Sequence, residues 1–235
     1  MTTHTKFLSL GVIGLTTAYS QAAIIWGDAQ NIVTEIDDVS TNGSLHAAVN
    51  AASIDLVDGE GVPNPDITLN GVVFESGNIN DATNISTTSF NSNNDADLNV
   101  GGIGDTTAYQ TFLGDIDFAG NADPNPGVID IENLVVGNLY EIQVWYVDNR
   151  PGGNNNRVTT FSSDGDGGNS VALNDQFAIG TFTADALTES FSVSTSGALP
   201  NLTGFQVRDL GAVPEPSSAL LSGISLLALL ARRRR

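Results

Sequence analysis

The sequence predicts an all-β protein, a single jelly-roll-like β-sandwich between two apolar end segments. Several runs alternate between apolar and polar residues with a period of two, the pattern of a half-buried strand. Gly, Asn, Asp and Pro cluster between these runs and mark turns. Outside the two ends, no stretch has the spacing of an amphipathic helix. Short sequential strands separated by frequent turns are typical of sandwiches and jelly rolls.

The clearest strand lies at residues 138–148, and further strands are expected at residues 67–74, 177–183, 187–194 and 202–210. Residues 45–52 fit either a short helix or a strand. Residues 75–111 are rich in Asn, Ser, Thr, Asp and Gly, so we expect a long loop region there with one or two edge strands.

The length of 235 residues suits one domain with two processing segments. We expect a signal peptide at residues 1–22, a β-sandwich domain at residues 23–211 and a sorting signal at residues 212–235.

The charge between the two ends is strongly negative. All 27 acidic residues lie between Lys6 and Arg232, and that stretch holds three basic residues, so its net charge is −24. Such a surface repels nucleic acid, because phosphate binding needs Lys and Arg. It attracts divalent cations or basic partners, although acidity also serves simply to keep an exported protein soluble.

Catalytic motifs are scarce in the sequence. The chain has no Cys, which excludes disulfides, thiolate metal sites and a cysteine nucleophile. His46 is the one histidine beyond the N-terminal segment, and no Gly-x-Ser-x-Gly or His-Glu-x-x-His motif occurs. We therefore expect a protein that is not an enzyme. The alternative is a secreted glycan-cleaving enzyme that uses two of the many carboxylates.

The N-terminus has the three parts of a secretory signal peptide. Lys6 is followed by an apolar core of about 12 residues and then by small residues around the cleavage position. We expect signal peptidase to cut after Ala22 or Ala23.

The C-terminus has three parts, which are an extended Pro-Glu-Pro segment, a short apolar stretch and a basic end. Pro214 and Pro216 disfavour helix and hold the backbone open. Residues 219–231 would form a helix of about 20 Å, short of the ~30 Å hydrocarbon core of a bilayer. The terminal arginines favour the cytoplasmic side, which places the body outside the cell. The residues that carry this signal are Val213, Pro214, Glu215, Pro216, Arg232, Arg233, Arg234 and Arg235.

This tail resembles the PEP-CTERM sorting signal. The resemblance implies a short transmembrane helix, processing near Pro-Glu-Pro by the membrane enzyme exosortase, and a location at the cell surface or in the extracellular matrix of a Gram-negative-type bacterium. Proteins with this tail are associated with bacteria that produce exopolysaccharide, so the resemblance also implies an extracellular polysaccharide as partner. A plain C-terminal anchor is the alternative.

The strand at residues 138–148 has two distinct faces. Tyr140, Ile142, Val144 and Tyr146 form the expected core face, whereas Trp145 lies beside Gln143 on the more polar face. An exposed Trp beside polar side chains is a sugar-stacking candidate; the alternative is that a loop covers it. The segment with Leu134, Gly137 and this strand is similar to galactose-binding-like and malectin-like sandwiches.

The loop that follows this strand contains two of the three basic residues of the body. Asp148 is expected to pair with Arg150 or Arg157 across the mouth of the loop. A guanidinium there could instead bind a sugar hydroxyl or a carboxylate.

The candidate cofactor is Ca²⁺, at a loop where Asp and Gly alternate. Asp164, Asp166 and Asn169 offer oxygen ligands in the manner of an EF-hand loop, but the distal Glu of such a loop is absent. A glycine-rich hairpin turn is the alternative. Weaker versions of the same pattern are Asn93-Asn94-Asp95-x-Asp97 and Asn121-x-Asp123.

Overall fold

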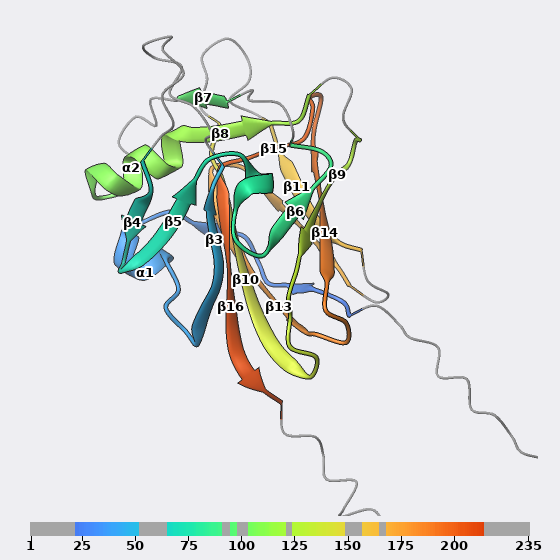
Figure 1. Ribbon diagram of the computed structural model, residues 1–235. Coiled ribbons are helices and arrows are strands. Elements are labelled where there is room, and N and C mark those ends of the chain that lie inside the picture. The colour runs from blue at the N-terminus through green and yellow to red at the C-terminus, as the bar shows by residue number, and fades with distance from the viewer. Residues whose placement is uncertain are drawn as a thin grey trace, which may run out of the picture.

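The computed structural model describes residues 22–51, 65–90, 95–97, 103–120, 124–148, 157–164 and 168–213, with the backbone alone at 95–97. The expectation of a predominantly β protein is confirmed, because strands from several sheets far outweigh helices in this part of the chain (Figure 1).

The largest sheet has eight strands in the order β1-β13-β10-β16-β3-β5-β4, with β2 pairing to β13. Neighbouring strands are antiparallel except for β3 and β5, which run parallel. The strands are β1 (Ile25–Trp26), β2 (Gln30–Asn31), β3 (Ser44–Asn50), β4 (Ile67–Leu69), β5 (Val72–Ser76), β10 (Asn138–Tyr146), β13 (Gln176–Thr183) and β16 (Gly204–Ala212).

A second sheet has five strands in the order β12-β11-β14-β9-β6. They are β6 (Ile85–Thr87), β9 (Gly127–Ile131), β11 (Thr159–Ser163), β12 (Ser170–Leu173) and β14 (Glu189–Thr195). A third, short sheet crosses one end of the molecule at the top of Figure 1. It contains β7 (Asp95–Asp97), β8 (Asp115–Phe118) and β15 (Asn201–Leu202).

The two larger sheets pack face to face over a shared apolar core. The β10 side chains predicted to face the core, Tyr140, Ile142, Val144 and Tyr146, all lie in it. The second sheet contributes Phe161 and Phe191, and the Phe191 ring packs edge-on against Phe205 of β16 at 5.6 Å. The period-two pattern therefore assigned the core face of β10 correctly.

A second core lies on the opposite face of the large sheet. It is covered by helix α1 (Glu35–Asp38), the β4–β5 hairpin and helix α2 (Thr107–Gly114). Gly204 permits this packing, because a Cβ at this position would meet the Phe112 ring at 2.7 Å. The large sheet is thus apolar on both faces at its upper end, and the structure has three layers there.

The sequence did not decide between a helix and a strand for residues 45–52. The structure has strand β3 there. Residues 75–111 hold the expected edge strands β6 and β7, a 3₁₀ turn (η1, Ile79–Asp81) and the start of α2. The helix α2 was not predicted. Its N-terminus is capped by the Thr106 hydroxyl, which accepts from the Tyr109 N–H.

Candidate functional site

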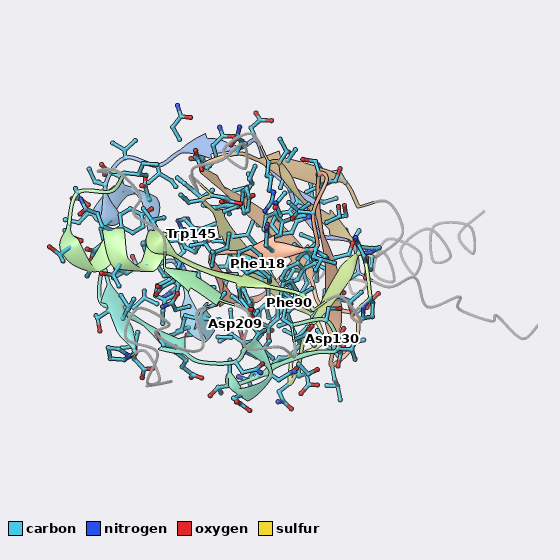
Figure 2. The ribbon with its side chains drawn as sticks, turned by 90° about the horizontal axis from the view of Figure 1, so that it is seen from above. Phe90, Phe118, Asp130, Trp145 and Asp209 are labelled. Carbon is cyan, nitrogen blue, oxygen red and sulfur yellow. The ribbon has the colours of Figure 1, made fainter. Side chains whose placement is uncertain are left out.

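Trp145 is fully buried, so the sugar-stacking candidate at this residue is wrong and the alternative, a covered ring, is confirmed. Its ring packs against Phe112 at 5.4 Å, Phe74 at 5.8 Å and Phe177 at 6.3 Å. Its indole N–H donates to the Tyr109 hydroxyl at 3.2 Å. The ring forms the centre of the second core, because α2 and the β4–β5 hairpin cover the face that the strand pattern left open (Figure 2).

Gln143 lies on the same face of β10 and is also fully buried. Its side-chain oxygen accepts from the Ser40 N–H at 3.1 Å and from the Gln206 side chain at 2.8 Å, and its amide group donates to the Asp38 carbonyl. This face of the strand carries a polar side chain, as predicted, but contacts with Asp38, Ser40 and Gln206 occupy that side chain, so Gln143 is not free to bind a ligand.

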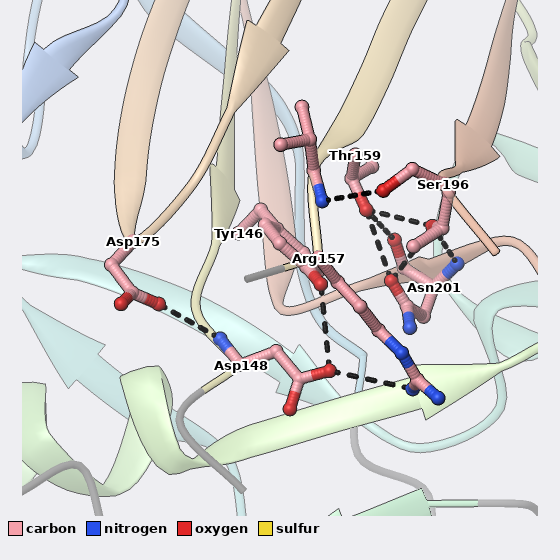
Figure 3. Close-up of polar contacts among 9 residues, drawn as sticks. Tyr146, Asp148, Arg157, Thr159, Asp175, Ser196 and Asn201 are labelled. Carbon is pink, nitrogen blue, oxygen red and sulfur yellow. Dashed lines mark hydrogen bonds and ion pairs between the residues drawn. The ribbon is translucent and has the colours of Figure 1, made fainter. Parts of the chain in front are cut away.

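Asp148 and Arg157 are brought together where β10 ends, as the sequence predicted (Figure 3). The Arg157 Nη1 atom lies 3.6 Å from Oδ2 of Asp148, whose side chain is 1% exposed against 23% for that of Arg157. The backbone N–H of Asp148 donates to Asp175, and the Tyr146 hydroxyl lies 3.4 Å from Asp148 Oδ2. The pair thus joins a buried carboxylate to a partly exposed guanidinium. Arg150 lies outside the described residues.

A buried hydroxyl–amide network lies next to this pair. The Thr159 and Thr195 hydroxyls are 2.7 Å apart, and both contact the Asn201 side-chain oxygen, at 3.0 and 2.8 Å. The Asn201 amide nitrogen is buried without a hydrogen-bond partner. This network joins β11, β14 and β15, so it positions the segment that starts at Arg157 (Figure 3).

Asn169, of the predicted calcium loop, is occupied by a structural contact. Its side-chain oxygen accepts from the Trp26 N–H at 2.6 Å, and its amide group donates to the Trp26 carbonyl at 2.9 Å. Asp164 is exposed, and Asp166 lies outside the described residues. Within the described residues, no three His, Asp or Glu side chains cluster closely enough to hold a metal ion.

Glu189 is a buried acid that sequence reasoning missed. It starts β14, is 1% exposed, and its Oε1 atom has no hydrogen-bond partner. Burial, together with the negative charges of Asp185 and Asp164, raises the pKa of Glu189 to about 8. The only sequence signal was its alternation with Phe191 and Val193, which places it on the core-facing side of the strand.

Hydrogen bonds hold the chain to the body close to both of its predicted ends. Ala22 and Ala23 are half-buried, and the Ile24 N–H donates to the Ser163 hydroxyl at 2.9 Å. At the other end, the Val213 N–H donates to the Gly137 carbonyl at 3.2 Å. The remaining sorting residues, 214–216 and 232–235, lie outside the described residues. In the described part of the chain, no helix is both long and apolar enough to cross a membrane.

Comparison with known families decides the nature of the tail. A family model described as the PEP-CTERM protein-sorting motif matches residues 212–235. The C-terminal tail is a PEP-CTERM sorting motif. The chain is therefore an exported protein sorted by exosortase, with processing that begins at the membrane. No curated protein and no solved structure matches the chain.

Proposed function

We propose that this PEP-CTERM protein is a non-catalytic component of the cell surface or extracellular matrix of a Gram-negative-type bacterium. In this proposal the two packed sheets are one jelly-roll-like β-sandwich, spanning residues 23–211. The observation that carries it is the junction between body and tail. Strand β16 ends at Ala212, and the sorting motif begins at the same residue.

This junction lets processing leave the body intact. Strand β16 pairs on both sides, with β10 and with β3, and Val213, where the described residues end, donates a backbone hydrogen bond to Gly137. Cleavage near Pro214–Pro216 removes no residue that belongs to the sheet. Signal peptidase cleavage after Ala22 or Ala23 likewise keeps Ile24, a core residue, in the mature chain.

The register of β10 shows which end of the sandwich lies beside the tail and which end, called the far end below, lies opposite to it. Asn138 pairs with Ala212 beside the tail, and Trp145 pairs with Gly204 at the other end. Asp148 and Arg157 therefore lie beyond the end of β10 that is remote from the tail. While the tail is in the membrane, this far end points outward.

A polysaccharide is the proposed partner, bound at the far end by residues of the loop between β10 and β11. Support comes from the association of this tail with exopolysaccharide producers and from the partly exposed Arg157. Its guanidinium has five N–H donors, and the contact with Asp148 uses one nitrogen, which leaves donors for sugar hydroxyls. The remaining candidate residues are thus Asp148, Arg150 and Arg157.

A glycan array with the processed protein tests this proposal. Binding to at least one acidic or neutral polysaccharide is expected, with a loss of about tenfold for Arg157→Gln, since one charge-assisted contact contributes roughly 1.5 kcal/mol. The variant Asp28→Asn alters an exposed acid at the edge of the large sheet and serves as the control. No binding to any glycan, or equal binding by the Arg157 variant, contradicts the proposed site.

The glycan-cleaving alternative has one observation in its favour. The raised pKa of Glu189 beside Asp164 and Asp185 suits a general acid. However, Glu189 is 1% exposed, so a sugar cannot reach it in this conformation. The histidine of the body, His46, is also engaged in the structure, because its ring Nε2 atom contacts the Glu132 carbonyl oxygen at 2.8 Å. Release of reducing ends from glycans, abolished by Glu189→Gln, would favour the enzyme over the binding protein.

A further inference from the structure

Four large apolar side chains are exposed at the end of the sandwich that lies beside the tail. They come from the β9–β10 loop, the β13–β14 loop and the residue after β16, and we call them the apolar rim: Val135, Val136, Leu187 and Val213. Each is between 42% and 67% exposed. Scattered exposed apolar residues are ordinary on a protein surface, whereas a group of them at one place marks an interaction surface.

Backbone hydrogen bonds hold the three segments of the apolar rim against one another. The Leu134 N–H donates to the Leu187 carbonyl at 3.0 Å, and the Gly137 N–H donates to the Ala184 carbonyl at 2.8 Å. On the other side, the Val213 N–H donates to the Gly137 carbonyl at 3.2 Å. The β9–β10 loop therefore lies between the β13–β14 loop and the end of β16, at the bottom of Figure 1.

The two valines of the rim belong to a turn whose backbone is fixed. The Val135 N–H donates to the Tyr140 hydroxyl at 2.8 Å, and the Val135 carbonyl accepts from the Asn138 N–H at 3.1 Å. Gly137 completes the turn at a φ of 89°, in the left-handed region that favours glycine. A fixed turn loses little conformational entropy when its side chains bind, so the rim is preorganised for contact.

The length of the tail brings this end of the body close to the membrane. The described residues end at Val213, and the apolar stretch of the tail begins at residue 219, so residues 214–218 join the two. Five residues span at most about 18 Å when fully extended. Because the sorting motif at residues 212–235 is processed at the membrane, the rim lies within that distance of the lipid surface before cleavage.

The charges around the rim indicate which lipid surface it fits. No Lys or Arg occurs in residues 132–138, 184–188 or 209–213, whereas each of these segments carries one acid, Glu132, Asp185 and Asp209 respectively. An anionic lipid surface would repel these acids. Contact with a bilayer at this end therefore comes from the apolar side chains, and a zwitterionic surface suits it best.

We propose that the apolar rim rests on the surface of a zwitterionic bilayer while the tail is in the membrane. Val135, Val136 and Leu187 lie at the level of the lipid headgroups, and the sandwich stands with its far end outward. This contact holds residues 214–216 beside the membrane, where the sorting enzyme acts. The proposal rests on the sorting tail and is independent of polysaccharide binding.

Site-directed fluorescence quenching tests this contact, because the chain has no Cys and a single introduced Cys carries the label. The exported chain of residues 23–235, with Leu187→Cys labelled by the fluorophore NBD, is reconstituted at low density in phosphatidylcholine vesicles that contain spin-labelled phosphatidylcholine. Quenching is expected for the label at residue 187. The matched control is Ala108→Cys on α2, which is exposed and lies on the helix that packs on Trp145 near the far end. Its label should not be quenched.

Replacing the two valines tests the apolar side chains themselves. Val135→Ser combined with Val136→Ser, in the chain labelled at residue 187, should lower the ratio of docked to undocked protein by about tenfold, because two side chains lose their contact with lipid. Val73→Ser changes an exposed valine of β5 and should leave the quenching unchanged. Thermal unfolding of both variants should match that of the parent chain, since all three valines are exposed.

Four results overturn the proposal. The first is no quenching at residue 187, and the second is equal quenching at residues 187 and 108. The third is quenching that persists in full in the double Val variant. The fourth is a loss of quenching at residue 187 as the protein density in the vesicles rises, because a second copy would then compete for the rim more strongly than lipid does.

Discussion

The indole N–H of Trp145 donates a hydrogen bond of 3.2 Å to the hydroxyl of Tyr109. That hydroxyl in turn donates to the Asp38 carboxylate at 3.0 Å, which also accepts from the Val33 N–H. The chain of contacts joins the large sheet to α2 and α1. Burial raises the pKa of Asp38, and burial together with the Asp38 charge raises the pKa of Tyr109.

The first prediction concerns this chain of contacts. Tyr109→Phe leaves the Trp145 N–H without an acceptor and removes one of the two donors to Asp38, so it should destabilise the protein by about 1–3 kcal/mol. Urea unfolding measures the change. Trp145→Phe in the Tyr109→Phe background should cost less than it does in the wild type, because the shared contact is already lost. Additive effects of the two changes would show that the contact contributes nothing.

The second prediction concerns the pair of Asp148 and Arg157. Arg157→Met leaves a buried carboxylate with less compensation, and we expect a loss of about 1–2 kcal/mol. Adding Asp148→Asn removes the uncompensated charge, so the double variant should be more stable than Arg157→Met alone. Chemical denaturation of the four proteins gives the coupling energy. A double variant that is less stable than both single variants contradicts this account of the pair.

The third prediction is a pH dependence at Glu189. The pKa of Glu189 is raised to about 8 in the folded protein by burial and by Asp185 and Asp164, whereas the unfolded chain titrates near an ordinary Glu value of ~4.3. Between these values the folded state binds more protons than the unfolded state, so stability falls as pH rises through this window. The stability that protonated Glu189 contributes is therefore fully present below pH ~4.3 and is lost as pH rises through the pKa of the folded state.

Glu189→Gln should flatten this dependence and raise the Tm at pH ~8 by about 2–4 °C, the shift for roughly 1 kcal/mol in a domain of this size. Tm measured across the window for both proteins is the check. The exposed residue Asp28 gives the control, since Asp28→Asn should leave the slope unchanged. A wild-type stability that rises across the window contradicts the assignment.

The fourth prediction separates the loop at residues 164–170 from a calcium site. Asn169 bonds both backbone polar groups of Trp26, so Asn169→Ala should cost about 1–2 kcal/mol from two lost hydrogen bonds. The same loss is expected in EDTA and in Ca²⁺, as read from unfolding in both buffers. A loss seen with Ca²⁺ alone would instead support metal binding by this loop.

The sequence predicted the strands, the core face of β10 and the pairing of Asp148 with a loop arginine, because these follow from local alternation and from charge. It left open whether Trp145 is exposed or covered. The covering helix α2 is short and is fixed by its Thr106 cap and by Phe112, neither of which gives a clear helical stripe. A strand pattern reports which residues share a face, but it does not report what packs on that face.

The burial of Glu189 could not be predicted, because a lone acid in an alternating strand gives no sign of its neighbours.

Intact mass of the protein recovered from the producing bacterium tests the central claim most directly. The account predicts a chain that begins at residue 23 or 24 and ends near Pro214–Pro216, with or without a group added at the new C-terminus. A recovered mass that still includes the arginines at residues 232–235 would contradict sorting by the PEP-CTERM tail.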